Sequence, residues 1–400
     1  LDWPIDGAEM APWYTMAEDK LGVTQTNGRP ALPGNNNYKV FEKGAKALEY
    51  EKVHTGNMAI ASDDNQARTM CQQTGFCFQG CKWGAKWSAG YNDIPEGEAT
   101  GNLEVRPQSH VARILHNDKG LVTGVEYYDA DGTLQTQMAS VVCVAGNSFE
   151  SPRLLLNSAS EMFPNGLANS SDQVGRNYMR HTTGSVYATF DKPVKMWRGT
   201  TMAGIVQDEA RHDPARGFVG GYELETLSLG LPFMAAFLDP GAWGREFTSA
   251  LDSYENMAGM WIVGEDMPQA TNRVTLNMDV KDQYGLPVAN VHFDDHPNDI
   301  AMRNHAYDQG QAIYDAVGAT RTFPTPPYPS THNLGTNRMS EDPKDGVVNK
   351  WGQTHDIANL FISDGSQFTT GAAENPTLTI VALAIRQADH IAREMSAGNI

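Results

Sequence analysis

Apolar and polar positions follow two different periods along the chain, and the change from one to the other predicts the order of the elements. Residues 7–20 and 38–50 show helical spacing. Residues 105–145 alternate as strands do, and turn residues at 117–120 and 129–132 interrupt them. The alternation and the two turns together predict a three-stranded meander.

A change of pattern after the meander predicts a strand, a turn and a helix. The apolar strand 140–144 runs into Gly146 and Asn147. We expect the helix that follows to have Ser151 as its N-cap and Pro152 in its first turn. This order is typical of a nucleotide-binding α/β layer.

The C-terminal part repeats this order, and a different region separates the two. A buried strand at 358–364 leads through a Gly-rich turn into a helix from 376 to about 395, whose apolar positions keep helical spacing. From 185 to 323 strands and turns are mixed without βα alternation, which predicts an antiparallel sheet. We therefore expect an α/β fold in which residues 1–185 and 324–400 form one domain and 186–323 form a second, α+β domain.

Composition narrows the class of protein. The 400 residues give room for two domains, and the net charge of −18 is spread along the chain. A basic stripe for nucleic acid and a polybasic membrane patch are both missing from the sequence. No apolar run approaches the roughly 20 residues of a membrane span. The chain starts at Leu1 without a signal-peptide pattern, and we expect it to be a fragment of a longer protein.

Three of the four cysteines lie within one loop, 71–88. Cys71, Cys77 and Cys81 have the spacing C-x5-C-x3-C, with glycines between and after them. Thiolates bind iron–sulfur clusters, and the trio suits a three-iron cluster or a four-iron cluster with one other ligand. A zinc site completed by His54 or His110 is the chemical alternative. Three reduced thiols without a metal are the third interpretation.

A histidine and an asparagine near the C-terminus are candidates for chemistry. His332 follows a proline-rich segment, and Asn375 and Pro376 open the last helix as its expected N-cap and first residue. The start of a helix presents backbone N–H groups and a positive dipole end, which suit negative charge. A structural hydrogen bond for His332 and ordinary capping by Asn375 are the alternatives.

Several segments, taken in order, resemble the glucose–methanol–choline (GMC) oxidoreductase family over nearly the whole chain. They are residues 2–5 with the following helix, 145–155, 174–177, 332–336 and 364–377. The cysteine trio followed by Gly84 and Ala85 is similar to the iron–sulfur branch of that family, the large catalytic subunits of bacterial FAD-dependent glucose, gluconate and sugar-alcohol dehydrogenases.

The resemblance implies an FAD-dependent dehydrogenase that oxidises a CH–OH group of a sugar, sugar acid or polyol. His332 would take the hydroxyl proton while hydride passes to flavin N5, and Asn375 would hydrogen-bond the same oxygen. The residues implied to contact FAD are Val111 at the adenine, Gly146 and Asn147 in the second signature, Asp364 and Gly365 along the ribityl–pyrophosphate portion, and Asn375, Pro376 and Thr377 at the pyrimidine end.

The same resemblance implies an electron route and partners. Cys71, Cys77 and Cys81 would hold a 3Fe-4S cluster that passes electrons to a cytochrome-type acceptor. The expected partners are a small chaperone-like subunit and a cytochrome c subunit. They would place the protein in the periplasm or at a membrane, with the cytoplasm as the alternative, and no span or nucleic acid is expected.

One departure from the family is that no Gly-x-Gly-x-x-Gly phosphate loop occurs in the sequence. We therefore expect the dinucleotide-binding N-terminal segment to be missing, the Rossmann-like FAD-binding domain to be incomplete and FAD to bind poorly to this chain alone. Two alternatives stay open: a GMC alcohol- or choline-type dehydrogenase or oxidase without a cluster, and an incomplete fragment with a structural role. The presence of both His332 and Asn375 argues against the latter.

Overall fold

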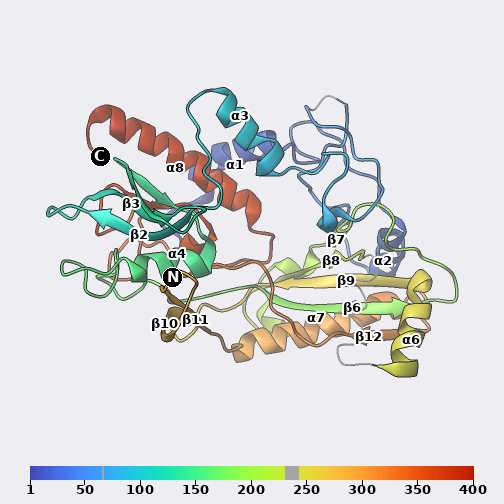
Figure 1. Cartoon of the computed structure of the whole chain (residues 1–400). Coiled ribbons are helices and arrows are strands. Elements are labelled where there is room, and N and C mark those ends of the chain that lie inside the picture. Colours follow the sequence, from blue (N-terminus) through green and yellow to red (C-terminus); the bar gives the residue numbers. More distant parts are fainter. Residues whose placement is uncertain (65–66, 230–242) are drawn as a thin grey trace.

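The computed structural model describes residues 1–64, 67–229 and 243–400. Figure 1 shows two regions side by side, one built around long helices and one around a large sheet. Each region has its own hydrophobic core of buried side chains. None of the helices in the described ranges combines the length and apolar character that a bilayer crossing requires.

The helical region contains the predicted strand–turn–helix segments. Its elements are α1 (Gly7–Leu21), β5 (Val142–Val144), α4 (Asn147–Asn157), β13 (Leu360–Ile362) and α8 (Thr377–Ala397). Strands β5 and β13 pair in parallel, and α1 packs along α8 (Figure 1). Asp6 caps α1, and Gly22, with φ +63°, ends it in the left-handed conformation that glycine adopts readily. Both strands and the helices after them lie where the sequence predicts them, and the structure adds that the two strands pair in parallel.

The predicted meander is also confirmed. It consists of β2 (His110–His116), β3 (Val122–Tyr128) and β4 (Leu134–Met138), paired antiparallel in that order. The two turns close where the turn residues stand, through hydrogen bonds from Gly120 N to Asn117 O and from Gly132 N to Asp129 O.

The second region is built on a six-stranded sheet with the order β1-β7-β8-β9-β6-β12 and antiparallel pairing throughout. Its strands are β1 (Val53–His54), β7 (Ile205–Val206), β8 (Tyr222–Thr226), β9 (Met257–Gly264), β6 (Thr182–Thr189) and β12 (Arg321–Pro324). Helices α2 (Asn36–Ala47) and α7 (Pro297–Asp315) pack against it. The antiparallel sheet is as predicted, although β1 and α2 reach it from the N-terminal part of the chain.

The remaining elements connect the two regions or cover their surfaces. They are α3 (Asp93–Ala99), α6 (Gly244–Asp252), the hairpin β10 (Arg273–Lys281) and β11 (Pro287–His292), and the 3-10 turns Cys77–Gln79, Ala89–Tyr91, Asp208–Ala210, Pro214–Arg216, Tyr254–Asn256 and Gly365–Gln367. The hairpin lies within 186–323 in sequence but packs on α4 of the helical region. A division of the chain at 185 and 323 therefore stays a prediction.

Two helix starts differ from the prediction. Helix α4 begins at Asn147, so Ser151 lies inside the helix and is not its N-cap. The Ser151 hydroxyl accepts from Gly146 N at 2.9 Å and donates to the Asp364 carboxylate. Helix α8 has Pro376 at its N-cap position and no side-chain cap. The side chain of Asn375 is hydrogen-bonded elsewhere, so its predicted capping role was wrong.

Candidate active site

His332 and Asn375 lie 43 positions apart in the sequence but line the same cavity, of about 510 Å³. Aromatic residues of the large sheet and of the loop before His332 form much of its wall, including Tyr187, Trp261 and Tyr328. A concave, largely apolar cavity with a few polar groups is the usual form of a small-molecule site. The structure thus brings the two predicted catalytic residues together.

The His332 ring is held by contacts on one side only. Its Nδ1 lies 2.9 Å from His181 Nδ1, its backbone N donates to Ser330 Oγ at 3.0 Å, and its ring packs at 5.4 Å from that of Trp261. No hydrogen bond among the described residues reaches Nε2. Burial, and next the neighbouring His181, lower the pKa of His332 to about 3. The ring is therefore neutral at ordinary pH.

Asn375 is oriented by a buried carboxylate. Its Nδ2 donates to Oε1 of Glu225, which is 1% exposed and lies in β8 opposite Trp261 of β9. Glu223, two residues earlier on the same face of β8, is fully buried. Burial raises the pKa of both carboxyl groups well above the ordinary glutamate value, and for Glu223 the charges of Glu225 and Glu374 raise it further. The pair therefore retains a proton where ordinary glutamates have lost theirs.

The start of α8 borders a second cavity of about 250 Å³, which Asn375 and Pro376 line together with Gly371 and Thr379. With no side-chain cap, the first backbone N–H groups of the helix, beginning at Thr377, have no intrahelical acceptor. These donors and the positive end of the helix dipole fit an electron-rich or anionic group. The expectation that this helix start contacts the pyrimidine end of FAD stays a prediction.

The residues predicted along a cofactor's phosphate portion also meet. Asp364 and Gly365 follow β13, and Gly146 and Asn147 follow β5, so parallel pairing places them at one edge. The Asp364 carboxylate accepts from Asn147 N at 2.9 Å and from Ser366 N at 2.8 Å. Val111 lies on β2 and is 38% exposed. Neither Val111 nor these four residues line the two cavities.

The cysteine loop does not form the predicted cluster site. In the described ranges, no group of three or more His, Cys, Asp or Glu side chains is placed to hold a metal ion. Cys71 and Cys81 pack against a small apolar cluster, while Cys77 begins a 3-10 turn. Cys71 Sγ instead accepts from Gln73 Nε2 at 3.6 Å. Because the three sulfurs do not converge, neither the iron–sulfur nor the zinc prediction is supported.

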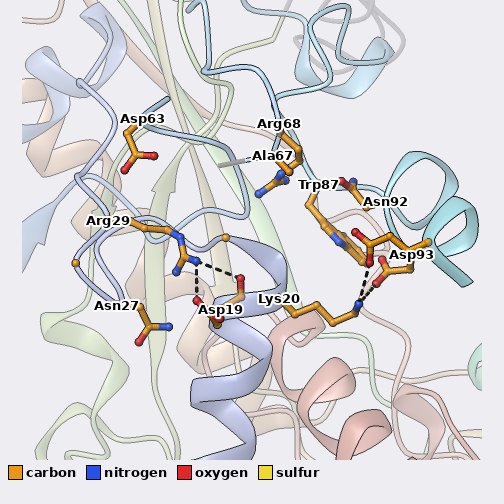
Figure 2. A pocket seen from close by; sticks show the side chains of 13 residues that line it. Asp19, Lys20, Asn27, Arg29, Asp63, Ala67, Arg68, Trp87, Asn92 and Asp93 are labelled. Atoms are coloured by element: carbon orange, nitrogen blue, oxygen red, sulfur yellow. Dashed lines mark hydrogen bonds and ion pairs between the residues drawn. The ribbon is translucent and has the colours of Figure 1, made fainter. Parts of the chain in front are cut away.

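A third cavity, of about 520 Å³, lies at the C-terminal end of α1 and against α3. Figure 2 shows its charged side chains engaged with one another: Arg29 with Asp19 at 2.7 Å and Lys20 with Asp93 at 2.6 Å. The predicted catalytic and cofactor residues are not among its lining.

A histidine and an asparagine thus line one cavity, beside a helix start that borders a second. Comparison with known proteins gives the family. Models of the GMC oxidoreductases match residues 4–183 and 268–384. The chain is 34% identical over 419 aligned positions to 2-methyl-1,2-propanediol dehydrogenase of Mycolicibacterium austroafricanum, covering 99% of this chain and 75% of that protein. This chain belongs to the GMC oxidoreductase family.

Other relatives and solved structures agree. The large subunit of fructose dehydrogenase from Gluconobacter japonicus is 28% identical, over 99% of this chain and 76% of its own. The gluconate 2-dehydrogenase flavoprotein of Pantoea cypripedii is 29% identical, over 88% and 62%. Pyridoxine 4-oxidase from Mesorbium loti has the same fold, with a TM-score of 0.65 at 16% identity over 97% of this chain and 77% of that one.

These matches decide two sequence-based expectations. The family and its class, oxidoreductases acting on CH–OH groups, are confirmed. The expected incompleteness of the FAD-binding domain is not supported by these matches, in which the family's N-terminal model matches residues 4–183.

Three residues at the site were missed by sequence reasoning: His181, Glu223 and Glu225. His181 stands four residues after the Val174–Asn177 landmark, directly before β6, and one sequence gives no sign that it will meet His332. The two glutamates did carry a signal. Acidic residues stand at alternate positions of the strand Tyr222–Thr226 and so share one face. Since carboxylates are seldom buried without a partner, two of them on one face of an apolar strand indicate a polar site there.

Proposed function

We propose that this chain is the catalytic part of an FAD-dependent dehydrogenase that oxidises a CH–OH group of a polyol, sugar or sugar acid. The observation that carries the proposal is the meeting of His332 and Asn375 in one cavity, with the uncapped start of α8 directly beside Asn375. The names of the polyol, fructose and gluconate dehydrogenases among its relatives support the substrate class.

Each residue has a task that its geometry suits. When FAD is bound, its flavin ring supplies the acceptor for the hydride that leaves the substrate carbon. His332 Nε2 takes the hydroxyl proton, so that alcohol becomes carbonyl as one proton and one hydride leave. Asn375 hydrogen-bonds the same oxygen and holds the carbon in position. The first N–H groups of α8 would stabilise the negative charge of the reduced flavin.

The electron acceptor and the partners form a finer part of the proposal. The fructose dehydrogenase relative is named a large subunit, which supports an assembly with further subunits, such as the small and cytochrome c subunits that the resemblance implies. A periplasmic or membrane-associated place would follow from such partners. Since the cysteine loop does not fit a cluster, no electron route through one is proposed. Co-purification and cell fractionation of the native protein test the partners and the place.

Anaerobic reduction of the bound flavin tests the central proposal. The FAD-loaded protein is mixed with a 1,2-diol, a hexose, a sugar acid and a primary alcohol, and the flavin absorbance is followed in a stopped-flow instrument. We expect bleaching by at least one diol or sugar and none by the matching carbonyl compound. If dithionite bleaches the flavin and no CH–OH compound does, the proposal is wrong. Hydrogen peroxide formed on admitting air would identify an oxidase in place of a dehydrogenase.

A further inference from the structure

A second histidine, His181, stands behind His332. It is 1% exposed, and its ring meets the His332 ring edge to face with centroids 5.0 Å apart. Its Nε2 lies 3.0 Å from the carbonyl oxygen of Gly371, and its Nδ1 lies 2.9 Å from His332 Nδ1. Both ring nitrogens of His181 are therefore used, one by the backbone and one by His332.

The protons in this chain of contacts can be placed by elimination. A carbonyl oxygen only accepts, so His181 Nε2 carries the hydrogen. Burial lowers the pKa of His181 to about 4, so its ring is neutral and its Nδ1 has a lone pair. His332 Nδ1 must then carry a hydrogen and donate it to His181. The lone pair of His332 is left on Nε2, the nitrogen that a base must use toward the cavity.

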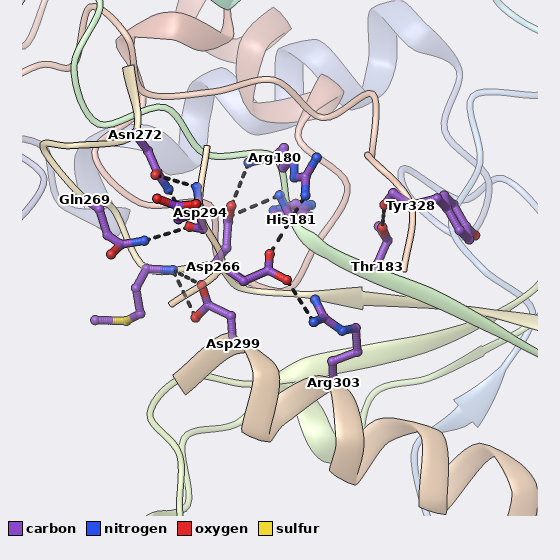
Figure 3. Close-up of polar contacts among 12 residues, drawn as sticks. Arg180, His181, Thr183, Asp266, Gln269, Asn272, Asp294, Asp299, Arg303 and Tyr328 are labelled. Carbon is purple, nitrogen blue, oxygen red and sulfur yellow. Dashed lines mark hydrogen bonds and ion pairs between the residues drawn. The ribbon is translucent and has the colours of Figure 1, made fainter. Parts of the chain in front are cut away.

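The surroundings hold His181 in this orientation. A Cβ on Gly371 would lie 2.9 Å from Cδ2 and 3.0 Å from Nε2 of the His181 ring, so only glycine allows this approach. Figure 3 shows the backbone anchor: the buried carboxylate of Asp266 accepts from Arg180 N at 2.7 Å and from His181 N at 3.2 Å. His181 itself has φ +57°, a left-handed conformation that a residue other than glycine adopts at some cost.

We propose that His181 is a positioning residue that accepts the Nδ1 hydrogen of His332 and so keeps the Nε2 lone pair of His332 directed at the substrate oxygen. The proposal rests on the proposed role of His332 as the base. A hydrogen bond to the far nitrogen commonly fixes the tautomer of a functional histidine. For histidines that bind a metal, losing such a partner costs about 10- to 100-fold, and we take this as the scale of the effect here.

Two variants separate the hydrogen bond from mere packing. His181→Asn keeps an acceptor close to the place of Nδ1 and tolerates the positive φ, since asparagine enters this region readily. His181→Leu keeps a volume close to that of histidine but has no acceptor. We expect the rate of flavin reduction to fall about 10- to 100-fold in His181→Leu and only a few-fold in His181→Asn, with KM changed little in either. Equal rates in the two variants, or an unchanged rate in His181→Leu, would overturn the proposal.

Nitrogen-15 NMR of the histidine-labelled wild-type protein tests the same contact without turnover. With the His332 signals assigned by their loss in His332→Ala, we expect a protonated Nδ1 and an unprotonated Nε2. A hydrogen on Nε2 contradicts the positioning role even if His332→Ala is inactive. If His332→Ala keeps its activity while the tautomer is as expected, the contact stands and the proposed role of His332 fails.

Discussion

His332 and Asn375, which line the same cavity of about 510 Å³, are supported in opposite ways. His332 contacts His181, which in turn contacts the carbonyl oxygen of Gly371, so its support consists of neutral groups and ends at one that cannot ionise. Asn375 leads to Glu225 and the adjacent Glu223, where buried carboxyl groups keep a proton. The histidine side fixes the direction of the His332 Nε2 lone pair. The carboxyl side fixes the direction of the Asn375 amide, next to groups that titrate.

This difference separates two kinds of pH response. The pKa values of His332 and His181, lowered by burial to about 3 and about 4, leave the histidine side unchanged from pH 5 upward. The carboxyl pair has pKa values raised by burial, so its proton is exchanged above the ordinary range of glutamate. The side that carries the proposed base is thus insensitive to pH, and the side that orients the substrate is sensitive.

The largest effect is expected from removing the base. His332→Ala should slow flavin reduction by the substrate about 10²- to 10⁴-fold, the usual contribution of a positioned general base, with the flavin spectrum unchanged. Stopped-flow absorbance measures this directly. His292→Ala is the matched control, because His292 lies on the hairpin strand β11 with 56% of its side chain exposed. A loss in both variants, or in neither, removes His332 from the chemistry.

A smaller effect is expected on the asparagine side. Glu225→Leu removes the acceptor of Asn375 Nδ2 and leaves an amide without its partner, which costs about 1–3 kcal/mol, or roughly 5- to 150-fold if the whole cost falls on the transition state. Glu225→Gln keeps an acceptor oxygen and should lose only a few-fold. Rates of flavin reduction compare the two variants. If Glu225→Leu reduces the flavin as fast as Glu225→Gln does, Glu225 does not orient Asn375.

A comparison of Glu225→Gln with wild type also tests whether the carboxyl side is the one that responds to pH. The titratable groups that act on Glu225 are Glu223 from the same strand and Glu374 from the loop before α8, with Asn375 as its uncharged partner. We therefore expect part of the pH dependence of flavin reduction between pH 5 and 9 to disappear in Glu225→Gln. The same dependence in both proteins would place the titrating group elsewhere.

The sequence predicts local features of this molecule well and contacts between distant segments poorly. Helices and turns follow from spacing and from residues such as Gly22 and Gly120, whose effect is confined to a few neighbours. The positions of His332 and Asn375 could be expected from the family motifs. The contact between His181 and His332, 151 positions apart, depends on how β6 packs against the C-terminal loops, which no local pattern encodes.

The cysteine loop shows the opposite failure. Its spacing is local and suggestive, yet the prediction required three sulfurs to converge, and spacing alone does not fix convergence. Burial comes first in raising the pKa of Cys71, while negative charge on Cys77 and Cys81 adds to it. The thiols are thus near enough to interact but are not arranged around a common centre in the described chain.

The smallest expected effect concerns stability, and it sharpens the contrast between the two sides. Folding raises the pKa of Glu223 above the ordinary value near 4.5, so the folded protein binds this proton more tightly than the unfolded chain. Its contribution to stability is therefore complete below pH 4.5 and is lost as pH rises toward the folded-state pKa. Glu223→Gln should flatten this loss and raise the melting temperature at pH 8 by a few degrees relative to wild type, measured by thermal unfolding from pH 5 to 9. The histidines change stability with pH in the opposite sense: because folding lowers the pKa of His181, stability falls as pH drops below 6.5. His181→Asn should therefore leave the loss of stability at alkaline pH as it is in wild type. A loss of stability at alkaline pH that Glu223→Gln leaves unchanged would mean that the carboxyl pair does not hold its proton in the folded protein.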